Sequence, residues 1–262
     1  MRSKVLVRGA GDIATGIIHR LYQSGFQVLA TEVAQPTVIR RTVSFAEAIY
    51  TGSYVVEEVT GVRVSDLEEA NQAWANNQVP ILVDPSGESA KTFQPDILVD
   101  AILAKKNLGT HLDMAPIVIG IGPGFTANED CHAVVETSRG HHLGRVYWKG
   151  SAIPNTGIPG VIGGAGRERV VHAPLQGVLM GLKEIGDHVE AGEPILTIDD
   201  QPVVAPISGV LRGLLRSNTQ VKQGLKIADI DPRDVSAYIH LISDKARAVA
   251  GGVLEAILHG SP

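Results

Sequence analysis

The sequence predicts an α/β region built on a mostly parallel sheet, followed by an all-β module and a C-terminal helix. Three observations support this prediction. Two short apolar segments near the N-terminus flank a stretch with apolar residues at helical spacing, which is typical of a β-α-β unit. Residues 173–199 are repeated in 205–231 as short apolar runs separated by glycine, which is typical of β-structure. A helical pattern then covers 243–259.

The first region alternates strand-like and helix-like segments. Its predicted elements, in chain order, are a strand at 4–8, a helix at 12–24, a strand at 27–31, a helix at 67–76, and strands at 79–83 and 116–121. The segment 97–105 fits either a strand or a helix. The segment 139–166 is rich in glycine, proline and asparagine and predicts a site-forming loop or a connection. In the C-terminal helix, Gly251 and Gly252 indicate that another backbone packs closely there.

Length and composition fit either one large domain or two modest domains with real cores. We predict an α/β region over 1–168, an all-β module over 169–232, and a C-terminal helical segment over 233–262 that packs back on the first region. The formal net charge is −5 at 262 residues, so nothing indicates a nucleic-acid partner. Cys131 is the single cysteine, and no apolar run is long enough to span a bilayer or to form a signal peptide, so we expect a cytoplasmic chain.

The segment Gly9–Ala14 fits the pattern G-x-G-x-x-A, follows a predicted strand and opens a predicted helix. Gly9 permits a tight turn, Gly11 allows close approach of a pyrophosphate, and Ala14 allows tight packing of helix on strand. Glu32 ends the next strand and could accept a hydrogen bond from a ribose hydroxyl. Asp12 would repel a phosphate at the helix start. Two interpretations of this segment stay open. It is either a Rossmann-like nucleotide site, with Asp12 counted among the cofactor-binding residues, or a tight structural turn.

A second group of candidates lies in the middle of the chain. Gly122 and Gly124 follow an apolar strand and could form a backbone anion nest or a plain turn. Arg139, Lys106 and Asn107 could hold phosphate or carboxylate, while Glu136 and His141 could act as general base and acid. Each alone is more often a solvated surface group. No spacing typical of a metal site is present, so no metal is expected.

The duplicated module resembles the biotinyl/lipoyl carrier fold, a barrel-sandwich hybrid of two interlocked halves. In that family, the hairpin between the halves carries a modified lysine. Here the equivalent tip is Ile198–Val203, which holds no lysine. The resemblance therefore implies the fold without biotin or lipoyl attachment, and we expect the module to serve as a docking surface or a wall of the site.

Several longer phrases together resemble one bacterial family, the selenium-dependent molybdenum hydroxylase system (maturation) proteins. The phrases are residues 39–48, 99–107, 122–125, 136–141, 154–157, 229–233 and 243–246. The match extends over essentially the whole chain. It implies an accessory role for a molybdenum hydroxylase of the xanthine dehydrogenase type, with that hydroxylase as partner and no settled reaction.

The leading hypothesis is therefore a maturation factor that binds a nucleotide or a molybdopterin-type cofactor at Gly9–Ala14. In this hypothesis Arg139 and Lys106 hold phosphate, and Glu136 or His141 moves protons if chemistry occurs. The first alternative is an NAD-dependent oxidoreductase, in which Glu32 would favour NAD over NADP. The second is a non-enzymatic scaffold that docks through the all-β module.

Overall fold

The structure is a computed structural model that describes residues 3–157, 160–161 and 163–260. The chain forms two compact units. Unit 1 comprises residues 1–36, 44–156 and 242–262, and unit 2 comprises 37–43 and 157–241. The domain ranges 1–168, 169–232 and 233–262 remain predictions.

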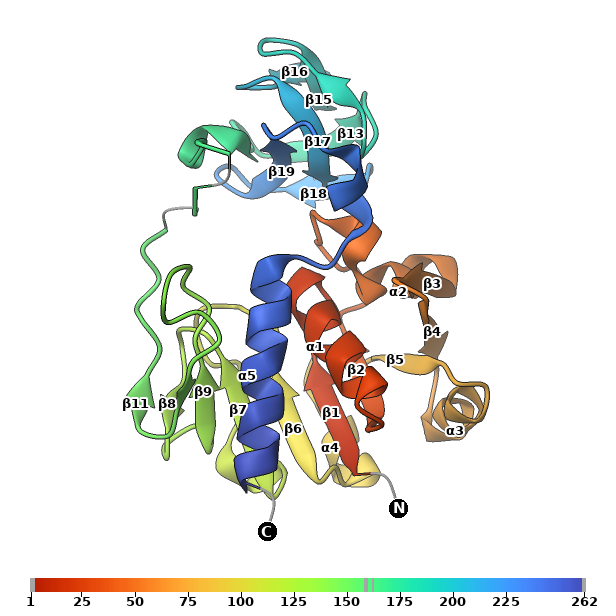
Figure 1. Cartoon of the computed structure of the whole chain (residues 1–262). Coiled ribbons are helices and arrows are strands. Elements are labelled where there is room, and N and C mark those ends of the chain that lie inside the picture. Colours follow the sequence, from red (N-terminus) through yellow and green to blue (C-terminus); the bar gives the residue numbers. More distant parts are fainter. Residues whose placement is uncertain (1–2, 158–159, 162, 261–262) are drawn as a thin grey trace. The chain divides into compact units, whose positions relative to one another are not determined.

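Unit 1 is built on a sheet of nine strands in the order β10-β9-β7-β6-β1-β2-β5-β4-β3, counted over the described residues (Figure 1). The strands are β1 Lys4–Arg8, β2 Gln27–Glu32, β3 Ser53–Val56, β4 Val59–Val64, β5 Val79–Val83, β6 Ile97–Asp100, β7 Ile117–Ile121, β9 Ala133–Val135 and β10 Val146–Tyr147. The pairs β3/β4 and β9/β10 at the two margins are antiparallel, whereas the pairs between them are parallel. A separate antiparallel pair joins β8 (Thr126–Ala127) to β11 (Gly150–Ser151).

Helices cover both faces of this sheet. Their bounds are α1 Asp12–Gln23, α2 Ala48–Thr51, α3 Leu67–Ala75, α4 Ser89–Phe93 and α5 Asp244–Gly260, with short 3-10 turns at η2 Phe45–Glu47 and η3 Leu112–Met114. Helices α1 and α5 lie side by side (Figure 1), and a Cβ at Gly16 would stand 2.7 Å from the Cβ of Ala246. The opposite face packs Leu6, Leu98 and Val118 against α3 and α4. The central strands are therefore buried on both sides, as their continuous apolar sequences require.

Unit 2 contains two four-stranded antiparallel sheets, β12-β19-β17-β14 and β16-β15-β13-β18. The strands are β12 Val170–His172, β13 Gly177–Gly181, β14 His188–Val189, β15 Pro194–Ile198, β16 Gln201–Val204, β17 Gly209–Leu214, β18 Thr219–Val221 and β19 Lys226–Asp231, with 3-10 turns at η1 Arg41–Val43, η4 Arg167–Arg169 and η5 Ser236–His240. Equivalent glycines of the repeat share one conformation, because Gly177 and Gly209 have φ of 156° and 148°. The hairpin tip between β15 and β16 is Asp199 and Asp200.

The predicted fold class, a Rossmann-like mostly parallel sheet with a biotinyl/lipoyl-like barrel-sandwich module, is wrong. The structure is α/β with one large mixed sheet and several antiparallel sheets. The apolar runs located most of the longer strands, but a run does not specify its partner. The sequence therefore did not predict the antiparallel hairpins at the two margins of the large sheet. Nor did it predict which strands pair within the two four-stranded sheets of unit 2.

Among the residues that the structure describes, no helix has the length and apolar character needed to cross a membrane.

Candidate functional site

Most of the predicted site residues follow the carboxyl ends of β1, β2, β6, β7 and β9, at one edge of the large sheet. Strand β1 pairs with β2 on one side and with β6 on the other, although the chain passes through β2 and β5 before it reaches β6. The crevice between β1 and β6 is therefore a topological switch point. Open α/β sheets bind ligands at such points, outside the carboxyl ends of the strands.

The glycine-rich turn after β1 lies at this switch point. Gly9 has φ +100°, and a Cβ there would stand 2.9 Å from the carbonyl oxygen of Ala101, so both backbone and packing require glycine. Gly11 is the N-cap of α1, with φ −72° and ψ −173°, a conformation open to any residue. Turn conformation and packing therefore explain Gly9, whereas the backbone of Gly11 does not itself require glycine.

Glu32 holds the turn. Its Oε2 accepts a hydrogen bond from the Ala10 amide at 2.9 Å, and its Oε1 accepts one from the Val33 amide at 2.8 Å. Burial raises the pKa of this carboxyl, and the two backbone hydrogen bonds oppose that rise. Each oxygen thus already binds the protein's own backbone, which weakens the predicted ribose contact.

A buried ion pair lies beneath the switch point. Arg8 ends β1 and Asp100 ends β6, and they are neighbours in register. The Arg8 Nη1 stands 3.3 Å from the Asp100 Oδ2, with side-chain exposures of 1% and 2%. Thr110 donates to the same carboxylate oxygen at 2.6 Å. The sequence analysis missed this pair. The available signal was Arg8, a charged residue at the end of an apolar strand and directly before the glycine-rich turn.

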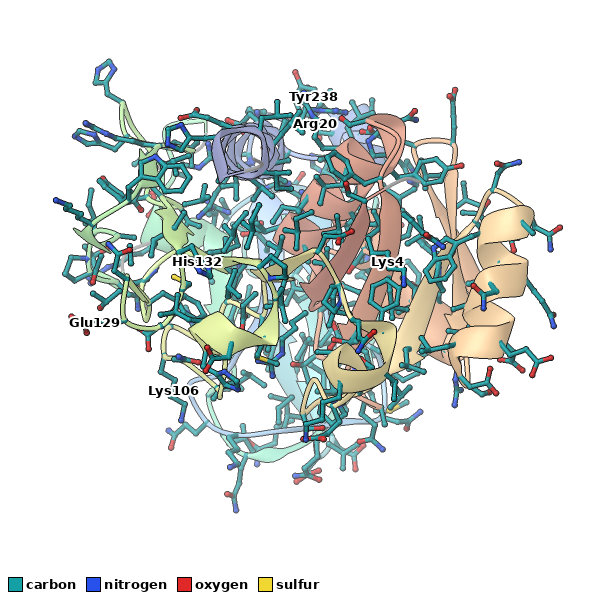
Figure 2. All side chains as sticks on the ribbon, turned by 90° about the horizontal axis from the view of Figure 1, so that it is seen from below. Lys4, Arg20, Lys106, Glu129, His132 and Tyr238 are labelled. Carbon is teal, nitrogen blue, oxygen red and sulfur yellow. The ribbon has the colours of Figure 1, made fainter. Side chains whose placement is uncertain are left out.

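The loops after β6 and β7 pack backbone against backbone. A Cβ at Gly124 would stand 2.6 Å from the Lys106 amide nitrogen, and one at Gly122 would stand 2.6 Å from the Thr137 hydroxyl. Packing therefore accounts for both predicted glycines. Lys106 lies on the exposed loop after β6 (Figure 2). Asn107 bonds to Thr110 within that loop, and its amide donates to Asp130.

The two residues of the predicted acid–base pair lie in different environments, and their catalytic roles remain a prediction. Glu136 is fully buried, and its carboxylate accepts hydrogen bonds from the amides of Thr137 and Ser138 at 2.7 Å and of Ile153 at 2.8 Å. His141 is exposed on the loop between β9 and β10. Glu136 therefore organises the backbone of the loop that carries Arg139.

A cluster of cations lies at the start of α5. Arg139 makes two hydrogen bonds to Asp244, at 2.8 and 3.1 Å. Lys245, next in sequence, is half-buried, and its pKa is lowered by burial first and then by Arg139. Lys105 lowers this pKa further, while Asp12 and Glu136 act in the opposite direction. Helix α5 packs on α1 where Gly16 meets Ala246, so Lys245 lies on the turn of α5 that faces α1.

We call the turn Gly9–Ala14 with Lys105, Arg139 and Lys245 the carboxyl-edge site. Sequence reasoning proposed the turn and Arg139. It did not select Lys245, because this residue is far away in sequence and reaches the site only through the packing of α5. The predicted close approach at Gly252 is confirmed and was the available signal, since a Cβ there would stand 2.1 Å from the carbonyl oxygen of Gly144.

Other chemistry-bearing side chains serve packing. Cys131 is buried, and burial raises the pKa of its thiol to about 12. His132, labelled in Figure 2, is partly buried, and its Nδ1 accepts a hydrogen bond from the amide of Val118 on β7 at 2.9 Å. In the described ranges, no three His, Cys, Asp or Glu side chains gather as metal ligands.

A cavity of about 300 Å³ lies at the opposite, amino-terminal edge of the sheet, between Tyr22, Trp74 and their neighbours.

The chain is similar to the uncharacterized protein YqeB of Escherichia coli. The two are 48% identical over 254 residues, which cover 97% of this chain and 47% of YqeB. The chain thus spans about half the length of this curated relative. No family model matches the chain.

Solved structures that resemble the chain do so weakly. The product-bound ectoine utilization protein EutE (DoeB) from Ruegeria pomeroyi is 10% identical over 87% of this chain and 85% of its own, with a TM-score of 0.26. A succinylglutamate desuccinylase/aspartoacylase from Rhodobacter sphaeroides is 14% identical over 81% and 61%, with a TM-score of 0.23. A family member from Shewanella amazonensis is 9% identical over 89% and 91%, with a TM-score of 0.27. Scores this low transfer neither a fold nor an activity.

The predicted membership of the molybdenum hydroxylase maturation family is wrong. The curated relative is described only as an uncharacterized protein, and the solved structures are described as desuccinylase or aspartoacylase relatives or as an ectoine utilization protein. Three functional hypotheses are therefore wrong as well. They are a maturation factor, an NAD-dependent oxidoreductase and a scaffold that docks through a barrel-sandwich module. The phrases that carried the resemblance fall on parts of β6, β19 and α5, on short 3-10 turns, and on loops such as the one that Glu136 organises.

Proposed function

We propose that this chain is a cytoplasmic protein that binds the phosphate groups of a small-molecule nucleotide at the carboxyl-edge site. The observation that carries the proposal is the position of the glycine-rich turn at the switch point between β1 and β6, at the N-terminus of α1. The first amides of a helix lack intrahelical partners and favour negative charge. Gly11 leaves room for a phosphate beside them.

Lys245 supports the same proposal. A half-buried lysine whose pKa is lowered by burial and by Arg139 is an unfavourable charge in the folded protein. A phosphate beside it would relieve that cost, because it brings negative charge close to the ammonium and to Lys105. Glu32 has no part in the proposal, since its oxygens hold the turn. Asp12 repels an anion, whereas the cations Lys245, Arg139 and Lys105 attract one, so these cations would hold the ligand against that repulsion.

Lys245→Met tests the proposal. A phosphate contact from an ammonium is a charge-assisted hydrogen bond, and its loss weakens binding by about tenfold or more. ADP and inorganic pyrophosphate are the probes, and the thermal shift of the full chain is the readout. Ligand at a hundred times Kd stabilises the folded state by about 2.7 kcal/mol. The matched control is Lys91→Met on α4, where the ammonium is exposed and pairs with Glu88.

The same variant separates a binding role from a structural one. The folded pKa of Lys245 lies below the ordinary value of 10.5. Between these two values the unfolded chain binds more protons, so this lysine's contribution to stability rises with pH there. At neutral pH it is a penalty, and Lys245→Met should unfold at the same or a higher temperature without ligand. Unchanged ADP and pyrophosphate affinity, or a clearly less stable variant at pH 7, would contradict the proposal.

A further inference from the structure

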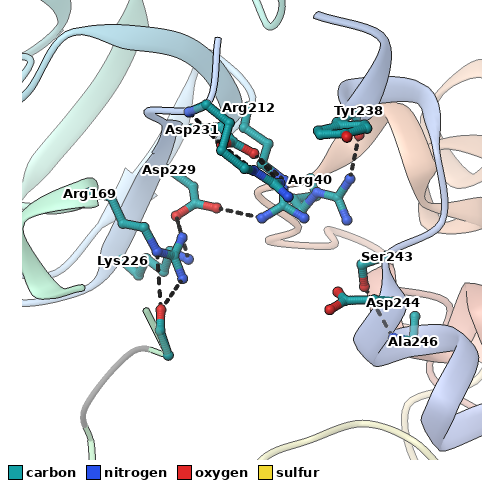
Figure 3. A network of polar contacts seen from close by, with 12 residues as sticks. Arg40, Arg169, Arg212, Lys226, Asp229, Asp231, Tyr238, Ser243, Asp244 and Ala246 are labelled. Atoms are coloured by element: carbon teal, nitrogen blue, oxygen red, sulfur yellow. Dashed lines mark hydrogen bonds and ion pairs between the residues drawn. The ribbon is translucent and has the colours of Figure 1, made fainter. Parts of the chain in front are cut away.

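The charged cluster of unit 2 is explained by the protein's own contacts (Figure 3). Asp229 of β19 forms ion pairs with Arg169, with Arg212 at 3.4 Å and with Lys226 at 3.5 Å. These pairs join η4, β17 and β19, so the cluster is part of the structure of unit 2. The cavity in unit 1 has no such structural explanation, and its lining indicates a ligand.

This cavity, of about 300 Å³, is bounded by the end of α1, the start of β2 and the segment that joins α3 to β5. Its lining is rich in two kinds of side chain. Although only 4% of the chain is aromatic, three lining residues are aromatic, and three others carry carboxamides. The aromatic residues are Tyr22, Phe26 and Trp74, and the carboxamide residues are Gln27, Asn77 and Gln78. None of the described lining residues carries a charge, so the cavity suits a small neutral ligand.

Two of the aromatic rings are held in place by the protein. The Tyr22 hydroxyl donates to the carbonyl oxygen of Asn77 at 2.8 Å, and the Trp74 Nε1 donates to that of Val28 at 2.8 Å. Trp74 also stacks on Phe93, with ring centres 5.7 Å apart. Because the polar atoms of both rings are bonded to backbone, the rings offer a ligand apolar ring surface in a fixed position.

Two of the carboxamides lie at matching positions on neighbouring strands. Gln27 begins β2, and Gln78 directly precedes β5. Each stands three positions before a member of the register pair Ala30 and Ile81, so the same register places the two glutamines opposite one another at the mouth of the cavity. A carboxamide combines an acceptor and two donors in one plane. Asparagine and glutamine recognise the edge of adenine with this pair of functions.

We propose that this cavity binds an adenine base, either free or as part of a nucleoside. The aromatic walls provide the faces on which a planar ring stacks, and Gln27 and Gln78 hydrogen-bond to its edge. The carboxyl-edge site lies at the other end of the same strands. Strand β2 has six residues and is about 20 Å long, so the two sites bind separate molecules.

The test follows the fluorescence of Trp74 in the full chain. The chain has two tryptophans, so Trp148→Phe leaves Trp74 as the single reporter. Adenine and adenosine should change this fluorescence in a saturable way. Toluene, an aromatic probe without a hydrogen-bonding edge, should bind about tenfold more weakly. Calorimetry on the chain that retains Trp148 provides the same affinities if Trp148→Phe fails to fold.

Variants locate the binding. Gln27→Met/Gln78→Met removes both carboxamides at similar side-chain length and should weaken adenine binding by about tenfold. Gln72→Met is the matched control, because Gln72 is exposed on α3 and outside the cavity lining. Lys245→Met should also leave adenine affinity unchanged, which separates this outcome from that of the carboxyl-edge site. Gln78→Met alone replaces the double variant if that one fails to fold.

The comparison of the two adenine probes identifies the source of the base. Tighter binding of adenosine than of adenine would identify a nucleoside, and equal or weaker binding would identify the free base. The proposal is overturned if neither probe binds at millimolar concentration, if toluene binds as tightly as adenine, or if the glutamine variant binds as tightly as the Gln72→Met control.

Discussion

Replacement of Asp100 by alanine should lower the free energy of unfolding by about 3–5 kcal/mol, the cost of leaving a buried charge without its partner. Arg8 and Asp100 are almost wholly buried at the ends of neighbouring central strands. The Asp100 carboxylate also accepts hydrogen bonds from Thr110 at 2.6 Å and from the Ile102 amide at 3.1 Å. Alanine removes all three interactions and leaves the Arg8 guanidinium in the interior.

Denaturant unfolding of the full chain measures this effect. Asp113→Ala provides the control, because Asp113 is an exposed acidic residue of η3 and its loss should change stability by less than about 0.5 kcal/mol. A loss of under about 1 kcal/mol for Asp100→Ala would mean that the Arg8 charge finds solvent or another partner, contrary to the burial of the pair. The free energy at stake is a large fraction of the stability of a typical domain.

Two adjacent glycines of α5 should respond in opposite directions to alanine. A Cβ at Gly252 would stand 2.1 Å from the Gly144 carbonyl oxygen and 2.8 Å from a methyl of Val135, so backbone must move. Such overpacking costs about 1–3 kcal/mol or more. Gly251 has no atom within 4 Å of its added Cβ, so alanine there should stabilise the helix by up to about 1 kcal/mol.

This pair of variants also bears on the site, because α5 carries Lys245. If Gly252→Ala displaces α5, the affinity for ADP should fall together with stability, whereas Gly251→Ala should leave the affinity unchanged. Thermal unfolding and calorimetry on both variants measure the two effects. Equal stability of the two variants would refute the close packing of α5 on the loop that contains Gly144.

Local sequence patterns located the elements of unit 1 that alternate regularly. The strands at Lys4–Arg8 and Val79–Val83 are confirmed at the predicted bounds, and the helix predicted over 12–24 ends at Gln23. The segment 97–105, which fitted two interpretations, forms the strand Ile97–Asp100 followed by a loop. Apolar periodicity sufficed there because each element buries a regular face against the sheet.

The hairpin of β3 and β4 was missed for a physical reason. Its two turn residues, Glu57 and Glu58, have φ of 43° and 72°, whereas hairpin turns of this kind usually carry asparagine or glycine. Glu57 accepts a hydrogen bond from the Ile242 amide and pairs with Arg247 at 2.6 Å. A tertiary interaction therefore holds a backbone conformation that its local sequence does not favour.

The candidate site was predictable only where its residues are local. The turn Gly9–Ala14 was found because its strand, glycines and helix are contiguous. Arg8 and Asp100 are far apart in the sequence and are brought together by the register of β1 and β6. Lys245 and Arg139 are also far apart in the sequence, and the packing of α5 brings them close. Glu136 was assigned a proton-transfer role and Glu32 a ribose contact because a sequence does not show that backbone amides already bind their oxygens.

Titration of the uniformly ¹⁵N-labelled full chain with ADP, followed by amide and lysine side-chain NMR, tests the central claim most directly. The account predicts that the amides of Gly11, Asp12 and Ile13 and the Lys245 ammonium shift together and saturate at one ligand concentration. Shifts confined to residues away from the carboxyl-edge site, or none at millimolar ADP, would contradict it.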